Sequence, residues 1–136
     1  MPDAPARILV VDDDPNVAEV VSRYLEREGF SVTTVGDGRQ ALDLALGNPP
    51  DLVVLDLMLP GMDGLEVCRR LRALAPVPVI MLTARGHKLL PSELAQTNIR
   101  HVVPKPFSAR FVLGLVREVL AEWGGDDAAV AQERAA

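Results

Sequence analysis

The sequence predicts a doubly wound α/β fold, in which a five-stranded parallel sheet and five helices form a three-layer sandwich. Short apolar runs alternate along the chain with segments whose apolar residues recur at helical spacing. This alternation is typical of parallel strands joined by crossover helices. In addition, most of the apolar runs end at a charged or hydroxyl residue, and ligand-binding residues in such sheets follow the carboxyl ends of the strands.

The first strand and the first helix have the clearest signals. Ile-Leu-Val-Val at residues 8–11 is a branched apolar run that stops at Asp12, which indicates a buried strand. Asp14 suits an N-cap and Pro15 the first helical position. The apolar residues that follow repeat at helical spacing until Gly29 ends the pattern. We therefore expect a helix directly after the first strand.

The remaining elements follow by the same reasoning. Further strands are expected at residues 30–35, 52–55, 77–82 and 102–103, the first of them weaker because hydroxyl residues alternate with apolar ones. Further helices are expected at residues 41–46, 65–74, 92–97 and 111–120, the third of them short and the last capped by Ser108. Glycine- and proline-containing turns or loops separate them at residues 36–38, 47–50, 57–63 and 85–91.

The length and charge of the chain predict one acidic domain. We expect the domain to span residues 7–123, after an N-terminal tail at residues 1–6. Residues 124–136 are small, polar and poorly patterned, and they predict a flexible C-terminal tail or the start of a linker. The formal net charge is −5 and no basic stripe is present, so we expect no direct contact with nucleic acid.

The single cysteine and the absence of long apolar runs predict a cytoplasmic protein. Cys68 alone can form neither an internal disulfide nor a multi-cysteine zinc site, and it fits a small core residue. No run approaches the roughly 20 apolar residues of a membrane span, and no secretory signal is recognisable. We therefore expect a reducing, cytoplasmic location and no membrane partner.

Charged and hydroxyl residues at the strand ends predict a site for phosphoryl chemistry. Strand one ends at Asp12 and Asp13, strand three at Asp56, strand four at Thr83 and strand five at Lys105. Crowded carboxylates repel, so a hard cation such as Mg²⁺ (or Mn²⁺) suits them. The cation also makes one carboxylate a suitable nucleophile toward a phosphoryl group, whose oxygens the ammonium and the hydroxyl can hold.

Four segments, in this order, resemble the receiver domain of two-component response regulators. They are ILVVDD at residues 8–13, DLVVLDLMLPGMDG at 51–64, VIMLTA at 79–84 and KPF at 105–107. No single motif is decisive, because Asp-Asp and Lys-Pro pairs are common, but all four at the ends of successive strands are highly specific. The resemblance covers about residues 7–121. The chain is similar to the chemotaxis-type single-domain regulators. The resemblance implies a flavodoxin-like sheet with strand order 2-1-3-4-5.

The resemblance also implies a role for each residue of the site. Asp56 is the expected phosphoacceptor. Asp13 is expected to bind Mg²⁺ directly, Asp12 to bind it partly through water, and the backbone carbonyl of Met58 to complete the set with Asp56. Lys105 is expected to pair with the phosphoryl group and with the Asp56 carboxylate.

Further positions match those that tune the site and transmit the switch. Thr83 is expected to swing toward the phosphoryl group, and Ala84 matches the small residue that keeps the site accessible. Met58 and Arg85 match the positions that tune how long the phosphoryl group survives. The bond before Pro106 is expected to be cis.

The segment before the last strand departs from the family pattern. Members commonly have Gly-Ala-Asp-Asp-Tyr where this chain has Asn-Ile-Arg-His-Val at residues 98–102. Val102 occupies the position of an aromatic residue that rotates with the threonine, and a valine cannot make that aromatic exchange between Thr83 and the output face. Arg100 and His101 replace acidic residues, and Leu115 replaces an arginine. We therefore predict that the salt-bridged dimer of DNA-binding members is missing and that the domain is stand-alone or cut from an unfamiliar multidomain protein.

The expected function is a signalling switch rather than an enzyme. A sensor histidine kinase or phosphotransfer protein would supply the phosphoryl group, and the domain would catalyse its own phosphorylation and dephosphorylation. The output partner is not identifiable. A phosphohydrolase usually needs a second acid two residues after the nucleophile, where this chain has Met58. The remaining alternative is a pseudo-receiver that binds partners without phosphorylation, but such domains normally lack an acidic or lysine position that this chain retains.

Overall fold

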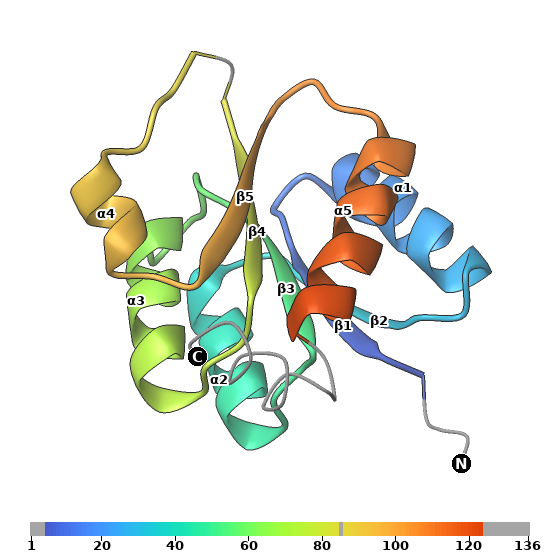
Figure 1. Cartoon of the computed structure of the whole chain (residues 1–136), viewed down its shortest axis with the longest axis horizontal. Coiled ribbons are helices and arrows are strands. Elements are labelled where there is room, and N and C mark those ends of the chain that lie inside the picture. Colours follow the sequence, from blue (N-terminus) through green and yellow to red (C-terminus); the bar gives the residue numbers. More distant parts are fainter. Residues whose placement is uncertain (1–4, 85, 124–136) are drawn as a thin grey trace, which may run out of the picture.

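The computed structural model describes residues 5–84 and 86–123 as five strands that alternate with five helices (Figure 1). The strands are β1 (Arg7–Val11), β2 (Ser31–Val35), β3 (Leu52–Asp56), β4 (Val79–Thr83) and β5 (Ile99–Pro104). The helices are α1 (Pro15–Arg27), α2 (Gly38–Gly47), α3 (Gly64–Leu74), α4 (Pro91–Ala95) and α5 (Ala109–Trp123). None of the described helices is long and apolar enough to cross a membrane. Most of the predicted N-terminal tail and all of the predicted C-terminal tail lie outside the described residues.

The five strands form one parallel sheet in the order β2-β1-β3-β4-β5, which confirms the predicted topology. Helices α1 and α5 cover one face, and α2, α3 and α4 lie on the other (Figure 1). Because successive side chains of a strand point to opposite faces, alternate residues build two separate cores. In β1, Leu9 and Val11 pack toward α2 and α3, whereas Ile8 and Val10 pack toward α1 and α5. The three-layer sandwich follows from this alternation.

The central strands are buried on both faces, which explains their unbroken apolar sequences. Every residue of β3 and β4 is buried, and the edge strand β2 is largely exposed. Burial of each large side chain, such as Leu52 or Ile80, contributes roughly 1.5–3 kcal/mol. The hydroxyl residues that weakened the prediction of β2 therefore mark its position at the edge of the sheet.

Two elements near the end of the sheet differ from the predicted bounds. Strand β5 begins at Ile99 rather than Val102, because its backbone pairs with β4 even where its side chains are partly exposed. Helix α4 spans Pro91–Ala95 rather than residues 92–97, and none of its residues is buried. The hydroxyl of Thr97 donates to the Leu94 carbonyl at 2.9 Å, and its Oγ1 also accepts the Ile99 N–H at 3.2 Å. A side chain that bonds the backbone in this way competes with helix continuation.

Candidate functional site

Three carboxylates meet at the carboxyl edge of the sheet. Asp12 and Asp13 follow β1, and Asp56 is the last residue of the neighbouring strand β3. The parallel register pairs Val11 with Leu55, so the residues that follow, Asp12 and Asp56, lie side by side. One carboxylate oxygen from each of the three residues lies within 4.8 Å of the others. Asp12 is 3% and Asp56 4% exposed, whereas Asp13 is exposed at the mouth.

Backbone N–H groups orient the two buried carboxylates. Asp12 Oδ1 accepts the N–H of Asp14 at 2.9 Å, and Asp56 Oδ1 accepts the N–H of Met58 at 3.0 Å. Asp14 in turn caps α1 by accepting the Asn16 N–H, as its position before Pro15 predicted. The second oxygen of each buried carboxylate is therefore directed toward the site.

Lys105 connects the two buried carboxylates. Its ammonium Nζ lies 2.8 Å from Asp56 Oδ2 and 3.3 Å from Asp12 Oδ2. The Lys105 N–H donates to the Thr83 carbonyl at 2.7 Å, which holds the chain after β5 against the end of β4. The Lys105–Pro106 peptide bond is cis, the isomer that the resemblance implied. The sequence therefore brings a residue 49 positions away from Asp56 into direct contact with it.

Burial and neighbouring charges raise the pKa values of two groups at this edge, the Asp12 carboxyl and the Lys105 ammonium. Burial raises the pKa of the Asp12 carboxyl, and the charge of Asp56 adds to this increase, although the Asp14 N–H and Lys105 oppose it. For Lys105, partial burial alone would lower the ammonium pKa, but the hydrogen bond to Asp56 and the charge of Asp12 outweigh burial and raise it. Lys105 is thus held in its charged form, while the Asp12 carboxylate is incompletely compensated.

The residues at this edge fit a hard divalent cation. Asp12 Oδ2 is buried and makes no hydrogen bond among the described residues, and its ionic partner is the ammonium 3.3 Å away. An incompletely compensated carboxylate oxygen beside two further carboxylates is the kind of donor set that Mg²⁺ binds. A hollow of about 290 Å³, lined by Asp12, Asp13 and the neighbouring residues of α1 and β2, leaves room for a cation and its waters.

Of the other predicted residues, Thr83, Ala84 and Met58 lie at this edge of the sheet, whereas Val102 lies further back in β5, opposite Met81. Thr83 is 1% exposed at the end of β4, and its hydroxyl finds no hydrogen-bond partner among the described residues. Ala84 follows it and is exposed, and Met58 is 67% exposed beside Asp56. Val102 in β5 is 37% exposed. Arg85 lies outside the described residues, so its expected tuning role stays a prediction.

Gly64, which the sequence placed only at the end of a loop, supports the segment that contains Asp56 and Leu57. A Cβ atom added at Gly64 would lie 2.8 Å from the Asp56 carbonyl oxygen and 2.8 Å from the Leu57 Cα. The Gly64 N–H donates to the Leu57 carbonyl at 2.9 Å. Only a residue without a side chain allows the start of α3 to approach the end of β3 this closely. The Asp-Gly pair in the sequence was the available signal.

Charged residues of β5 and α5 pair with each other within the chain. Arg100 contacts Glu122 at 2.9 Å, and His101 contacts Glu118 at 3.2 Å. The His101 side chain is 34% exposed and has this carboxylate as its partner. His87, in contrast, is exposed. Two basic residues of β5 thus have acidic neighbours on α5.

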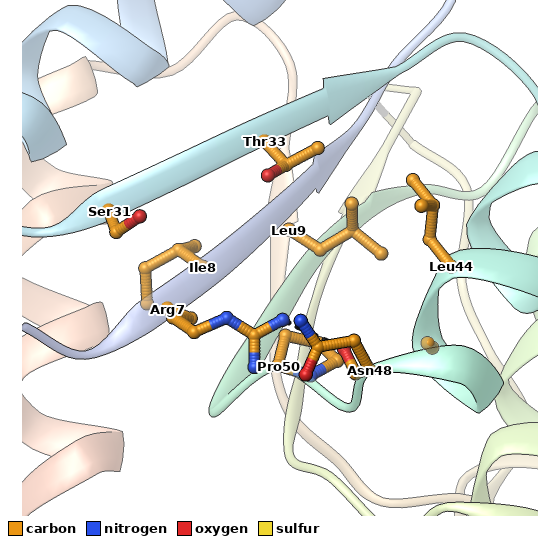
Figure 2. Close-up of a pocket in the computed structure, with 9 residues that line it drawn as sticks. Arg7, Ile8, Leu9, Ser31, Thr33, Leu44, Asn48 and Pro50 are labelled. Atoms are coloured by element: carbon orange, nitrogen blue, oxygen red, sulfur yellow. Dashed lines mark hydrogen bonds between the residues drawn. The ribbon is translucent and has the colours of Figure 1, made fainter.

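Two further features lie away from this edge. Cys68 is buried in α3, and burial raises the pKa of its thiol to about 12, which agrees with a core role. A pocket of about 120 Å³ lies at the amino ends of β1 and β2, beside α2 (Figure 2). Its Arg7 guanidinium donates to the carbonyls of Pro49 and Asn48 at 2.7 and 2.8 Å, so this cation fastens the loop before β3.

Comparison with known proteins identifies relatives over most of the chain. The family model of the response regulator receiver domain matches residues 8–117. The DNA-binding response regulator MtrA of Mycolicibacterium smegmatis is 47% identical over 111 residues, which are 82% of this chain and 49% of that protein. Response regulator MprA of Mycolicibacterium vanbaalenii is 44% identical over 126 residues, which are 92% of this chain and 54% of that protein. The chain therefore spans about half the length of these relatives.

Solved structures agree with the sequence relatives. The crystal structure of a CheY-like response regulator receiver domain protein from Methanospirillum hungatei JF-1 superposes with a TM-score of 0.80 at 28% identity. The match covers 87% of this chain and 95% of that one. Three observations agree with these matches: the strand order, the family match over residues 8–117 and the acidic edge next to a lysine. The chain belongs to the response regulator receiver domain family of two-component systems.

Proposed function

We propose that this receiver domain accepts a phosphoryl group onto Asp56 from the phosphohistidine of a sensor histidine kinase or phosphotransfer protein. The observation that carries the proposal is the cluster of Asp12, Asp13 and Asp56, whose oxygens lie within 4.8 Å of one another, with Lys105 bridging the two buried members. A lone strand-end aspartate requires no such surroundings. An aspartate that acquires two further negative charges does require them.

The side chains at the site have distinct roles in the transfer. A carboxylate oxygen of Asp56 attacks phosphorus, the bond from phosphorus to the donor imidazole nitrogen breaks, and that nitrogen keeps the electron pair. The Lys105 ammonium, held in its charged form by its raised pKa, pairs with a phosphoryl oxygen. The Thr83 hydroxyl, buried next to Asp56 without a partner among the described residues, turns to bind another. Water later attacks the aspartyl phosphate and releases inorganic phosphate.

A divalent cation, Mg²⁺ or Mn²⁺, completes this site in the proposal. Asp13, Asp12, Asp56 and the Met58 carbonyl would hold it. When bound, it neutralises the phosphoryl oxygens together with the crowded carboxylates. Asp12 gains from the cation, because burial and the charge of Asp56 raise its pKa in the metal-free protein.

The donor has a suitable approach along α1. An open groove of about 630 Å³ reaches from α1 to the loop between β5 and α5, and Lys105 and Ala84 form part of its wall. Its lining is mainly apolar, with Val17, Val20 and Phe107 among its residues. An apolar helix of the donor that packs here would bring its histidine next to Asp56, and the small Ala84 leaves that path open.

The proposed output is a change in the surface of α4, β5 and α5. Phosphorylation shifts an equilibrium between two arrangements of this surface, in which Thr83 takes part, while Val102 at the switch position cannot make the aromatic exchange of other members. The intrachain pairs of Arg100 and His101 with α5 support the prediction that the family's salt-bridged dimer is missing here. Size-exclusion chromatography with light scattering should show no dimer through this face with or without beryllofluoride, whether the domain is a monomer or dimerises through another surface. A phosphomimic-induced dimer through this face would refute the prediction.

The proposal describes a cytoplasmic switch that catalyses its own modification rather than an enzyme with a separate substrate. Relatives such as MtrA are named DNA-binding response regulators, and this chain spans about half of their length. Contact with nucleic acid would therefore come from a separate domain. The net charge of −5 supports this assignment, because the phosphates of DNA repel an acidic surface.

Intact-mass spectrometry after incubation with acetyl phosphate and Mg²⁺ tests the proposal. We expect the mass of one phosphoryl group on the wild-type chain and none on Asp56→Asn. Asp43→Asn is the matched control, because Asp43 is exposed on α2 away from the strand ends, and it should be modified like wild type. A chain that gains no mass from acetyl phosphate or from a phosphorylated kinase would instead be a phosphorylation-independent interaction module.

A further inference from the structure

The loop between β3 and α3, residues 57–63, lies between two positions that lack a side chain. Gly64 approaches it from α3, as described above. Gly38, the first residue of α2, approaches it from the other side. A Cβ atom added at Gly38 would lie 2.6 Å from the Met62 carbonyl oxygen and 2.9 Å from Val67 Cγ2. Atoms in real proteins do not come this close, so a side chain at Gly38 must displace its neighbours.

Helix α2 cannot withdraw to relieve such a clash. Asp37 caps its first turn, because the Asp37 Oδ1 accepts the Gln40 N–H at 2.7 Å. The buried face of the helix packs into the core through Ala41 and Ala45, which are 1% and 0% exposed. Close-packed helices shift only when their whole interface repacks. The loop, whose residues are mostly exposed or half-buried, is therefore the part that moves.

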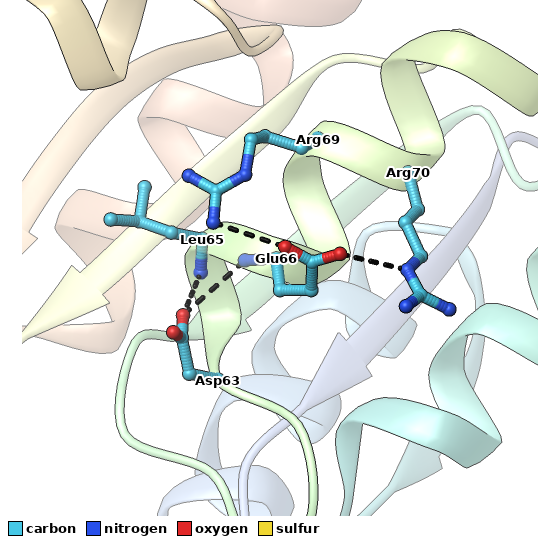
Figure 3. Close-up of polar contacts among 5 residues, drawn as sticks. All are labelled: Asp63, Leu65, Glu66, Arg69 and Arg70. Carbon is cyan, nitrogen blue, oxygen red and sulfur yellow. Dashed lines mark hydrogen bonds and ion pairs between the residues drawn. The ribbon is translucent and has the colours of Figure 1, made fainter.

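The loop cannot absorb the displacement at its α3 end. Asp63 Oδ1 accepts the N–H groups of Leu65 and Glu66 at 2.7 and 3.3 Å, which ties that end to the first turn of α3 (Figure 3). The Glu66 carboxylate is itself paired with Arg69 and Arg70 on the next turn (Figure 3). A shift at Met62 is therefore transmitted toward the start of the loop.

The start of the loop carries the backbone that the cation site uses. Met62 N–H donates to the Pro60 carbonyl at 3.0 Å, so a shift of Met62 also moves Pro60, which lies two residues after Met58. Met58 is the second residue of the loop, and its N–H orients the Asp56 carboxylate. Displacement of this segment would move the Met58 carbonyl and loosen the hydrogen bond that aims Asp56.

We propose that Gly38 is a positioning residue for the cation site: the side-chain-free start of α2 sets the place of the β3–α3 loop and, through it, of the Met58 carbonyl. The inference rests on the proposed function, because it assumes that the Met58 carbonyl is a cation ligand. Helix α2 contributes no side chain to the acidic pocket, so Gly38 acts only through the loop.

Titration calorimetry with Mg²⁺ on Gly38→Ala and Gly47→Ala tests the inference. Gly47 ends the same helix, and a Cβ added there meets nothing within 4 Å, which makes it the matched control. We expect Gly38→Ala to weaken Mg²⁺ binding roughly tenfold, the effect typical of residues that orient metal ligands. Gly47→Ala should bind like wild type. Amide NMR shifts of the metal-free proteins should change at Met58 and Met62 only in Gly38→Ala.

The outcomes separate this inference from the proposed function. If wild type binds Mg²⁺ and Gly38→Ala binds it equally well in a folded state, the positioning role is wrong and the proposed function stands. If wild type binds no Mg²⁺, the proposed function and the inference both fail. Should Gly38→Ala not fold, the double variant Gly38→Ala/Val67→Ala is compared with Val67→Ala instead. The double variant keeps the clash of the added Cβ with the Met62 carbonyl and removes its clash with Val67 Cγ2.

Discussion

Replacement of Lys105 by methionine probes how the two buried carboxylates are compensated. The Lys105 ammonium contacts Asp56 at 2.8 Å and Asp12 at 3.3 Å, and the carboxylate side chains are only 5% and 0% exposed. Methionine keeps the length of the side chain and removes its charge. In the metal-free variant, two buried carboxylates face each other without their cation.

The expected loss of stability lies between two limiting cases. Removing one partner of a fully buried ion pair costs about 3–5 kcal/mol, whereas an exposed pair contributes less than about 1 kcal/mol. The Lys105 side chain is 30% exposed, so solvent screens part of its interaction. We therefore expect Lys105→Met to lower the free energy of unfolding by about 2–3 kcal/mol, which corresponds to roughly 8–12 °C in Tm for a domain of this size.

Urea unfolding followed by circular dichroism measures this loss with EDTA and with Mg²⁺. Because a bound cation replaces the missing ammonium charge, we expect Mg²⁺ to restore part of the stability of Lys105→Met. The control is Lys88→Met, since Lys88 is the only other lysine of the chain and is exposed. The reasoning is refuted if Lys105→Met is as stable as Lys88→Met in EDTA, or if Mg²⁺ leaves the difference between them unchanged.

Four further predictions concern the same edge and the core behind it. The pKa of Lys105 is raised in the folded state, so the stability that Lys105 contributes should be fully present up to the ordinary lysine pKa of about 10.4 and should disappear as pH rises through the raised pKa. In urea unfolding along a pH series, the free energies of unfolding of wild type and Lys105→Met should therefore converge only in strongly alkaline solution. Thr83→Val should stabilise the metal-free protein by about 1 kcal/mol, because it removes a buried hydroxyl without a partner among the described residues; a lower Tm would contradict this. Gly64→Ala should lower the stability of the protein in thermal unfolding by about 1–3 kcal/mol, since the added Cβ meets backbone atoms at 2.8 Å. Gly114→Ala is the control and should not lower it, because the space around Gly114 is open. Burial raises the pKa of the Cys68 thiol to about 12, so iodoacetamide should label it in urea but not in the native state, as intact mass would show.

The apolar patterns predicted the sheet and its helices because burial leaves a direct mark on the sequence. Strands β3 and β4 are buried on both faces and are almost wholly apolar. The bounds of β5 and α4 were less accurate, because backbone pairing with β4 extends β5 beyond its two central valines. In α4 no residue is buried, so that helix has no apolar face for a pattern to reveal.

The sequence alone determined which chemical groups stand at the strand ends, since Asp12, Asp13, Asp56, Thr83 and Lys105 each follow or end an apolar run. Parallel strands place such residues at one edge, so their convergence was predictable. Only the tertiary structure decided that Lys105 bridges the two buried carboxylates and that positions 38 and 64 approach the backbone around the β3–α3 loop too closely for a side chain. The physical reason is that these contacts join segments that are distant in the chain. They depend on whether a single Cβ atom fits between packed elements, and such a fit produces no repeating pattern in the sequence.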